Sequence, residues 1–302
     1  MTLGGVWASA LVPWTPDDAV DLARLRDQLD VLAASGVDGI YAHGTAGEFH
    51  ALTADEHRAV SKLVADVCRE TGTPFQIGAN HMSAQTGLER ARSAADLRPL
   101  AIQVTLPDWL PLSMDEVLRF LDAVAAATAL VPLVLYNPPH AKTVLSPEQL
   151  GAVAARIPAL EGIKVADGDD GWYAEMRIHC AGLALFVPGH HLATGHRRGA
   201  AGSYSNVAAL TPTGAARWWR LIQEDPTAAD QVETTIRSFF DDHIVPLQLS
   251  GYGPPALDKA LAHIGGWSDT GTGVRWPASS VPAEYAEKLR SEARLRMPFL
   301  FD

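Results

Sequence analysis

Short runs of apolar and β-branched residues alternate along the chain with longer segments in which apolar residues recur every three or four positions. Leu22, Leu25, Leu29 and Leu32 illustrate the longer segments, because this spacing places them on one face of a helix. Strands that alternate with helices of ten to fifteen residues predict a parallel sheet covered by helices. The predicted strands span residues 6–12, 37–42, 75–78, 101–105, 133–136, 162–165, 183–187 and, with a weaker signal, 202–204.

The helix starts support this order of elements. Thr53 is followed by Glu56 three residues later, and Ser113 by Glu116, which is the capping-box pattern. Eight strands are the number that closes a barrel, and no Gly-x-Gly-x-x-Gly turn follows the first strand, as an open dinucleotide-binding sheet would require. The fold class predicted is therefore α/β, a (β/α)8 TIM barrel.

The last part of the chain has a different pattern. Residues 225–302 contain helical periodicity at 228–249, 255–264 and 282–296, with no strand of comparable quality, and a glycine-rich loop at 265–280. We therefore predict a barrel with the active site over residues 1–224 and a C-terminal helical extension over residues 225–302.

Composition and charge narrow the class of partner. The 302 residues are 47% hydrophobic and 20% charged, which is typical of a globular protein with a large core. The formal net charge of −11 disfavours nucleic acid and anionic membranes as partners. The most apolar stretch, residues 123–136, is shorter than the roughly 20 residues of a membrane span. Aspartates near the N-terminus do not fit a signal peptide, and Cys68 and Cys180 form no zinc or disulfide pattern, so we expect a cytoplasmic protein.

Lys164 is the most informative candidate for chemistry, because it lies inside a strand that should be covered on both sides. Burial disfavours the ammonium form and lowers the pKa of a lysine, so that free amine can attack a carbonyl and form a Schiff base. A lysine that reaches solvent along its stem, or is paired with a carboxylate, is the alternative for this residue alone.

Two further features are expected at the same barrel mouth, since loops after the strands build it. Tyr136 ends the strand adjacent to that of Lys164 and carries a phenol that can relay protons, although an aromatic side chain packed at the rim is the simpler explanation for it alone. The turn Gly44-Thr45-Ala46-Gly47 presents backbone N–H groups and one hydroxyl, which can hold a carboxylate. Glu48 is expected to brace this turn rather than to act as an acid or base.

These motifs together resemble the dihydrodipicolinate synthase / N-acetylneuraminate lyase family of class I aldolases, which form a Schiff base with pyruvate. The resemblance rests on the segment of residues 44–48, on Tyr136-Asn137-x-Pro and on Gly162-Ile163-Lys164 at this spacing, and it extends over nearly the whole chain, including residues 199–206.

The resemblance implies roles for individual residues. Lys164 would form the imine with pyruvate or another 2-oxo acid, and Tyr136 would shuttle protons to and from the bound intermediate. Thr45 and the amide of Ala46 would hold the substrate carboxylate. The family also implies a homotetramer built from two dimers and a reaction without metal or organic cofactor.

The resemblance also implies residues of the pocket wall, and it shows where this chain departs from the biosynthetic members of the family. Gly189 would line the pocket through its backbone, and Tyr204 would border the bound keto acid. Those members have a threonine at the position of Ala46, tyrosines where this chain has residues 107–108, and an arginine at the position of Ala141. Their proton relay and their clamp for the aldehyde carboxylate are therefore missing, which favours a different aldehyde or a dehydratase or hydratase reaction.

The histidines and one tryptophan are further candidates for substrate contact. His43, His140 and the pair His190-His191 all lie at predicted strand ends, and Trp109 is expected in the same mouth. The spacing of the histidines does not match that of common metal sites, so no metal is expected.

The sequence thus predicts a Schiff-base lyase or aldolase, or a dehydratase, acting on pyruvate or another 2-oxo acid. Three alternatives remain: a 4-hydroxy-tetrahydrodipicolinate synthase with replaced auxiliary residues, a catalytically retired family member that binds a keto acid, and a metal-dependent aldolase on the same barrel. Retention of both Lys164 and Tyr136 argues against the second, and the lack of a ligand set against the third.

Overall fold

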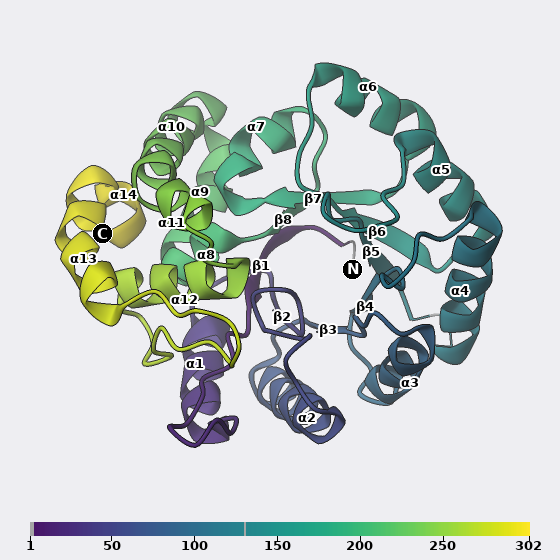
Figure 1. The fold of residues 1–302 in the computed structure, drawn as a ribbon. Helices are drawn as coiled ribbons and strands as arrows, with labels where there is room; N and C mark the ends of the chain where they lie inside the picture. Colours follow the sequence, from purple (N-terminus) through teal and green to yellow (C-terminus); the bar gives the residue numbers. More distant parts are fainter. Residues whose placement is uncertain (1–2, 130) are drawn as a thin grey trace.

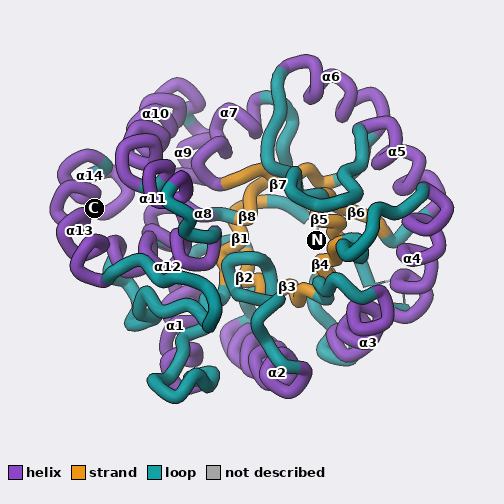
Figure 2. Tube along the Cα trace, viewed as in Figure 1, coloured by secondary structure: helices purple, strands orange, loops and turns teal. Residues whose placement is uncertain are grey.

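The protein is an eight-stranded parallel barrel surrounded by helices (Figures 1 and 2), seen in a computed structural model that describes residues 3–129 and 131–302. The strands pair in chain order, and β8 pairs with β1 to close the sheet. The predicted (β/α)8 barrel is therefore confirmed. The strands are β1 (Gly5–Ser9), β2 (Gly39–Ala42), β3 (Phe75–Gly78), β4 (Ala101–Thr105), β5 (Leu133–Tyr136), β6 (Leu160–Lys164), β7 (Ala184–Pro188) and β8 (Gly202–Tyr204).

Helices follow the strands and cover the outside of the barrel, as Figure 2 shows. The predicted capping boxes at Thr53 and Ser113 are both formed, and each satisfies backbone donors that the first turn leaves free. The helices of the barrel are α1 (Leu22–Ala34), α2 (Ala54–Thr71), α3 (Ala84–Ala95), α4 (Met114–Ala127), α5 (Pro147–Arg156), α6 (Asp170–His179), the 3-10 turn η1 (Gly189–His191), α7 (Leu192–Arg197), α8 (Asn206–Leu210) and α9 (Pro212–Glu224).

The barrel interior is packed by large side chains below the mouth. Trp7 is 1% exposed and lies in one apolar cluster with Tyr41, Phe186 and Tyr204. Glycine at position 39 makes room for this cluster, because a Cβ there would lie 2.3 Å from Cζ3 of Trp7. The interior is therefore a packed core that supports the site from below, not a pore.

The C-terminal helices pack onto the barrel and share its main hydrophobic core. The pattern at 228–249 predicts one helical segment, but the structure divides it between α10 and α11, next to Pro246, which has no N–H to continue a helix. The boundary predicted at residues 224 and 225 coincides with the junction of α9 and α10, and the division into two domains stays a prediction. These helices are α10 (Pro226–His243), α11 (Val245–Leu249), α12 (Pro254–Gly265), α13 (Ala283–Arg296) and α14 (Pro298–Phe301).

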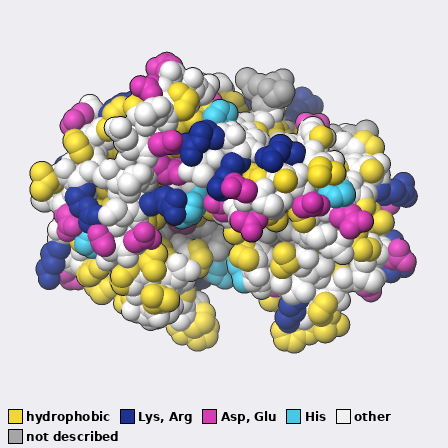
Figure 3. Space-filling model, turned by 90° about the horizontal axis from the view of Figure 1, so that it is seen from above, with side chains coloured by type: hydrophobic (Ala, Val, Ile, Leu, Met, Phe, Trp, Pro, Cys, Tyr) yellow, Lys and Arg dark blue, Asp and Glu magenta, His cyan; other side chains and the backbone are white. Residues whose placement is uncertain are grey.

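The surface carries charges of both signs. Figure 3 shows acidic and basic side chains intermingled on one face, with hydrophobic side chains gathered toward its lower edge. Within the described part of the chain, no helix combines the length and the apolar character needed to span a bilayer.

Candidate active site

A cavity of about 380 Å³ opens where the strands of the barrel end, and Lys164 lies in it. Its walls come from two sources. Strands β1, β2, β5, β6, β7 and β8, with the segments that follow them, form one side, and α10, α11 and α12 form the other. The polar side chains that line it are Ser9, Tyr41, Thr45, Tyr136, His140, Lys164, His190, Tyr204, Ser205, Asn206, Asp241, Gln248 and Asp258.

Lys164, the last residue of β6, extends its ammonium among three tyrosine rings. Its Nζ lies 4.2 Å from the ring centroid of Tyr136, 4.9 Å from that of Tyr204 and 5.4 Å from that of Tyr41. Desolvation lowers the pKa of Lys164 to about 8, although the negative charge of Asp258 opposes this shift. About a tenth of the side chain is therefore free amine at pH 7, far more than in a lysine of ordinary pKa, and a nucleophilic lysine needs the free amine.

Tyr136 ends β5 and is directly opposite Lys164 in the register of the two strands. Burial raises the pKa of its phenol, while a hydrogen bond with Thr45 opposes the shift. The phenol therefore stays protonated at neutral pH and can donate a proton close to the lysine. Lys164, Tyr136 and Thr45, predicted as the catalytic group, are brought together in this cavity.

The turn after β2 carries Thr45 and Ala46 to the cavity wall, as expected. Its glycines are required by close contacts: a Cβ at Gly44 would lie 2.4 Å from Cε2 of Tyr41, and one at Gly47 would lie 2.9 Å from the carbonyl oxygen of Ala10. The turn is therefore packed directly against the tyrosine that contacts Lys164. Its binding of a carboxylate stays a prediction.

Glu48 links this turn to other segments of the chain through its side chain, and its role as a brace stays a prediction. The carboxylate is buried and accepts hydrogen bonds from Nζ of Lys259 at 2.5 Å, from Nε1 of Trp14 at 2.9 Å and from the backbone N–H of Arg275 at 2.8 Å. Lys259 belongs to α12, so the ion pair ties the turn to the C-terminal helices.

Asp258, next to Lys259 on α12, is a site residue that the sequence analysis missed. It lines the cavity that holds Lys164, and burial raises the pKa of its carboxyl to about 7, although Lys164 opposes the shift. Asp258 lies far in sequence from any strand end, where a barrel of this kind carries its catalytic groups. The available signal was an acidic residue among the apolar positions of the helix, beside Leu257 and three residues before Leu261.

Tyr204 lies in the pocket wall as expected, whereas Gly189 lies just behind it. Tyr204 is 5% exposed, lines the cavity and donates its hydroxyl to Gln76 below it. A Cβ at Gly189 would lie 2.5 Å from Oγ of Ser205, so only glycine allows this close approach. Gly189 is buried at the start of η1, and the cavity is lined by the residues on either side of it rather than by Gly189 itself.

A second cavity of about 250 Å³ adjoins the first and shares Thr45, Tyr136 and His140 with it. Ala141, at the position of the missing arginine, lines this cavity. His140 therefore lies at the mouth as expected, although its contact with substrate stays a prediction. The other lining residues are Phe49, His50, His81, Met82, Thr105, Leu106, Asp108, Pro138 and Thr143.

Two expected substrate contacts lie outside both cavities. The His43 side chain is 1% exposed, stacks on His57 at 3.8 Å between ring centroids, and contacts Oγ of Ser61 at 2.8 Å. Burial keeps the pKa of His43 well below its usual value. Trp109 is 70% exposed on the loop after β4, where its carbonyl accepts a hydrogen bond from Nζ of Lys142. The geometry therefore supports neither His43 nor Trp109 as a pocket residue.

The histidine pair divides between two environments. His190 lines the main cavity, where its Nδ1 lies 2.8 Å from Nδ2 of Asn206, and burial lowers its pKa to about 4, so that it is neutral at pH 7. His191 instead contacts Asp167 at 3.3 Å. Within residues 3–129 and 131–302, no group of three or more histidine, cysteine or acidic side chains is arranged to hold a metal ion.

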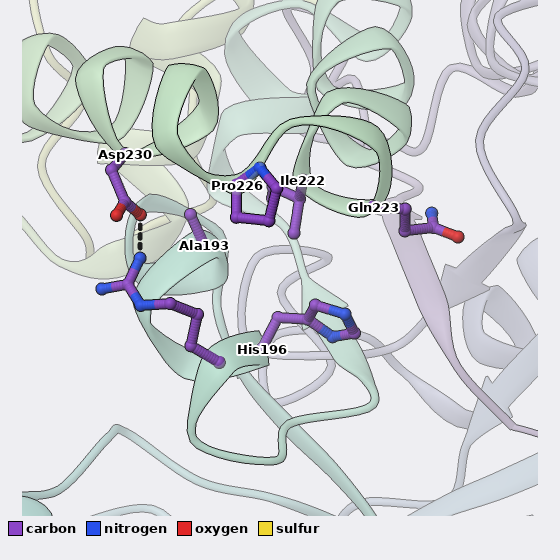
Figure 4. Close-up of a pocket in the computed structure, with 7 residues that line it drawn as sticks. Ala193, His196, Ile222, Gln223, Pro226 and Asp230 are labelled. Atoms are coloured by element: carbon purple, nitrogen blue, oxygen red, sulfur yellow. Dashed lines mark hydrogen bonds and ion pairs between the residues drawn. The ribbon is translucent and has the colours of Figure 1, made fainter.

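Another hollow, of about 310 Å³, lies outside the barrel between α7 and the ends of α9 and α10 (Figure 4). Its charged residues, Arg197 and Asp230, pair with each other, as the dashed line in Figure 4 shows. None of the residues that line it also lines the cavity of Lys164.

The fold and the site define a class of protein: a (β/α)8 barrel with a desolvated lysine at the end of β6 and a tyrosine beside it on β5. The model of the Dihydrodipicolinate synthetase family matches residues 2–294, and the chain belongs to this family.

Relatives of known name include two 4-hydroxy-tetrahydrodipicolinate synthases. That of Agrobacterium fabrum is 30% identical over 171 residues, which are 56% of this chain and 58% of the relative. That of Neisseria meningitidis serogroup C is 31% identical over 188 residues, 61% of this chain and 62% of the relative. The alignments thus span about three-fifths of these relatives.

Solved structures share the fold over nearly the whole chain. YagE of Escherichia coli, a prophage protein of the dihydrodipicolinic acid synthase family solved with pyruvate, has a TM-score of 0.86 at 21% identity, covering 98% of this chain and 99% of its own. N-acetylneuraminate lyase of Mycoplasma synoviae has a TM-score of 0.81 at 21% identity, covering 97% of each chain.

The buried ion pair between Glu48 and Lys259 generates a stability prediction. Lys259→Met leaves the Glu48 carboxylate buried without its cation, so we expect the free energy of unfolding to fall by about 3–5 kcal/mol, measured by urea denaturation. The double variant Glu48→Gln/Lys259→Met removes both charges, so its free energy of unfolding should fall less than that of the single variant.

Lys62→Met serves as the control, because it breaks an exposed ion pair with Asp66 and should change the free energy of unfolding by at most about 1 kcal/mol. A Lys259→Met protein as stable as the parent would show that Glu48 does not depend on this ion pair.

Proposed function

We propose that the protein is a lyase of the Schiff-base aldolase type that acts on pyruvate or another 2-oxo acid. The observation that carries the proposal is the position of Lys164, whose ammonium is desolvated among three tyrosine rings at the mouth of the barrel. Membership of the dihydrodipicolinate synthetase family supports the same chemistry.

In the proposed reaction the free amine of Lys164 attacks the C2 carbonyl of the keto acid, and loss of water gives an imine. The imine nitrogen withdraws electrons from C3, which stabilises the carbanion that forms when a C–C bond breaks or a proton leaves. Removal of water from the surroundings strengthens the polar contacts that stabilise these charges.

The neighbours of Lys164 supply the remaining functions. The phenol of Tyr136, held protonated by burial, is placed to exchange protons with the bound intermediate. The hydroxyl of Thr45 and the amide of Ala46, both at the cavity wall, would hold the keto-acid carboxylate. Tyr204 would border the bound acid, and His140 would contact the second part of the substrate.

The second cavity bears on the identity of that second part. Ala141 and Asp108 line it, so it presents no guanidinium from position 141 and adds one carboxylate. These features favour a neutral or hydroxylated aldehyde, or a sugar-derived acid in the cleavage or dehydration direction, over an anionic aldehyde. A 4-hydroxy-tetrahydrodipicolinate synthase remains the alternative, supported by the names of the relatives. A retired keto-acid-binding protein is the second alternative.

Assembly and location are part of the proposal. A homotetramer of two dimers follows from the family resemblance, and a cytoplasmic location from the composition and cysteine pattern. No metal or organic cofactor is included, because a Schiff base itself supplies the electron sink.

Covalent trapping tests the proposed nucleophile. Pyruvate or a related 2-oxo acid with borohydride should add covalent mass at Lys164, because reduction fixes the imine as a stable amine. Intact mass and peptide mapping locate the label. Lys164→Ala should abolish it, and labelling that persists in this variant would refute the assignment.

Tyr136→Phe tests proton transfer separately from imine formation. The variant should still be trapped by borohydride, while turnover falls roughly 10²–10⁴-fold, the range for removal of a positioned acid–base group. Steady-state kinetics with the best substrate of the panel measure the effect. Full turnover in the variant would limit Tyr136 to packing.

Substrate selectivity distinguishes the alternatives. Aspartate semialdehyde should be a poor partner for the pyruvate-bound enzyme, because a missing charge-assisted contact of about 1.5–3 kcal/mol lowers the rate by roughly one to two decades. A coupled assay compares it with neutral and hydroxylated aldehydes. If aspartate semialdehyde gives the highest kcat/KM of the panel, the biosynthetic synthase is the correct assignment.

A further inference from the structure

Asp258 carries a half-buried carboxyl group to which the proposed reaction assigns no role. It reaches the cavity from α12, a C-terminal helix, whereas Lys164 and Tyr136 reach it from the strands. Lys164 and Asp258 influence each other electrostatically, yet the ion pairs formed within 4.0 Å by the described residues do not include this pair. The two groups therefore line one cavity without forming an ion pair within 4.0 Å.

A carboxyl group in this place has to be explained, because burying a carboxylate without a direct cation partner destabilises a protein. The adjacent Lys259 does not neutralise it, since that ammonium binds Glu48 and the carbonyl of Gly273. Burial instead raises the pKa of Asp258 to about 7, so that both its acid and its base form are present near neutral pH. This is the range in which a general acid works best.

We propose that Asp258 is a catalytic acid–base group for the formation and hydrolysis of the imine at Lys164, and this rests on the proposed function. Addition of the amine to the keto acid forms the C–N bond and breaks the π bond of the carbonyl, and a proton moves from the nitrogen to the oxygen to leave a hydroxyl on C2. The Asp258 carboxyl donates its proton to that hydroxyl, the C–O bond breaks, and water leaves as the nitrogen lone pair forms the C=N bond. The products are a protonated imine, water and the Asp258 carboxylate. In hydrolysis the carboxylate takes a proton from the attacking water.

This role divides the acid–base work between two sides of the cavity. Tyr136 on the strand side exchanges protons at the substrate atoms whose bond forms or breaks. Asp258 on the helix side protonates the oxygen that leaves C2. The carboxylate that remains also balances the positive charge of the protonated imine. Such a division is consistent with the different surroundings of Tyr136 and Asp258, which give the two groups different protonation states near neutral pH.

The charged and titratable groups around Asp258 define what else could produce its pH dependence. They are Lys164 on β6, Tyr136 on β5, Tyr41 on β2, Tyr204 on β8, His190 on η1, His140 after β5 and Asp241 on α10. The buried tyrosines have raised pKa values and the pKa of His190 is lowered to about 4, so the three tyrosines and His190 do not titrate near pH 7, whereas Lys164 has a pKa of about 8. His140 and Asp241 lie at the exposed rim of the cavity.

The test is the rate of imine formation with pyruvate across pH, from timed borohydride quenches and intact mass. In the parent protein the rate should rise with pH as Lys164 loses its proton and fall as Asp258 loses its own, with the maximum between about pH 7 and pH 8. Asp258→Asn should lower the maximal rate roughly 10²-fold or more and remove the falling limb, while labelling at Lys164 still reaches completion on long incubation.

Asp258→Asn should also move the rising limb to lower pH, because the carboxylate that raises the pKa of Lys164 is gone. Asp258→Glu, which keeps the carboxyl group, should retain the falling limb. Asp242→Asn on α10 is the matched control, because the Asp242 carboxylate pairs with Arg296 outside the cavity. The rate of imine formation in this variant should depend on pH as it does in the parent protein.

The outcomes separate this proposal from the proposed function. Labelling at Lys164 with an unchanged rate and falling limb in Asp258→Asn refutes the role of Asp258 and leaves the Schiff base intact. A shifted rising limb with an undiminished plateau shows that Asp258 acts only through its charge, which also refutes it. Absence of label in the parent protein with every 2-oxo acid refutes both. If Asp258→Asn does not fold, a parent profile without a falling limb still refutes the proposal.

Discussion

The structure depends on the desolvation of one ammonium group. Lys164 stands at the end of β6, where three tyrosine rings from three other strands replace most of the water around Nζ. Removing water from a charge is costly unless a partner compensates, and here the compensation is partial. The pKa of the lysine therefore falls to about 8, and the group is divided between ammonium and free amine near neutral pH. A barrel suits this arrangement, because adjacent strands bring Tyr136 and Lys164 to the same level without any movement of the chain.

The C-terminal helices complete the site rather than merely extending the barrel. The buried carboxylate of Glu48 binds Lys259, which joins the turn after β2 to α12, and the same helix carries Asp258 to the cavity of Lys164. One ion pair thus fixes both the turn expected to hold the substrate carboxylate and the helix that supplies the second acid–base candidate. Glycines at positions 44 and 189 allow the surrounding backbone to pack closely, and their replacement would push it into neighbouring atoms.

Much of this structure could be predicted because its signals are local. Strands such as Phe75–Gly78 and Leu133–Tyr136 are short apolar runs between helix starts, and the rule that barrel sites lie at strand ends selected Lys164, Tyr136 and Thr45. Asp258 could not be found by that rule, because only the packing of α12 across the mouth brings it to the lysine. His43 was misplaced for a related reason: its side chain turns from the strand end toward α2, where Ser61 and His57 bury it.

Competitive acetylation across pH tests the desolvation of Lys164, because it measures the protonation of this residue without any substrate. The protein is exposed to limiting acetic anhydride together with a model lysine peptide, and labelling at Lys164 is quantified by peptide mass spectrometry. The reactivity of Lys164 is expected to be half-maximal near pH 8, well below the value of about 10.4 for the model peptide. If Lys164 gains reactivity only together with the peptide, its ammonium is not desolvated, and Lys164 is not activated as proposed.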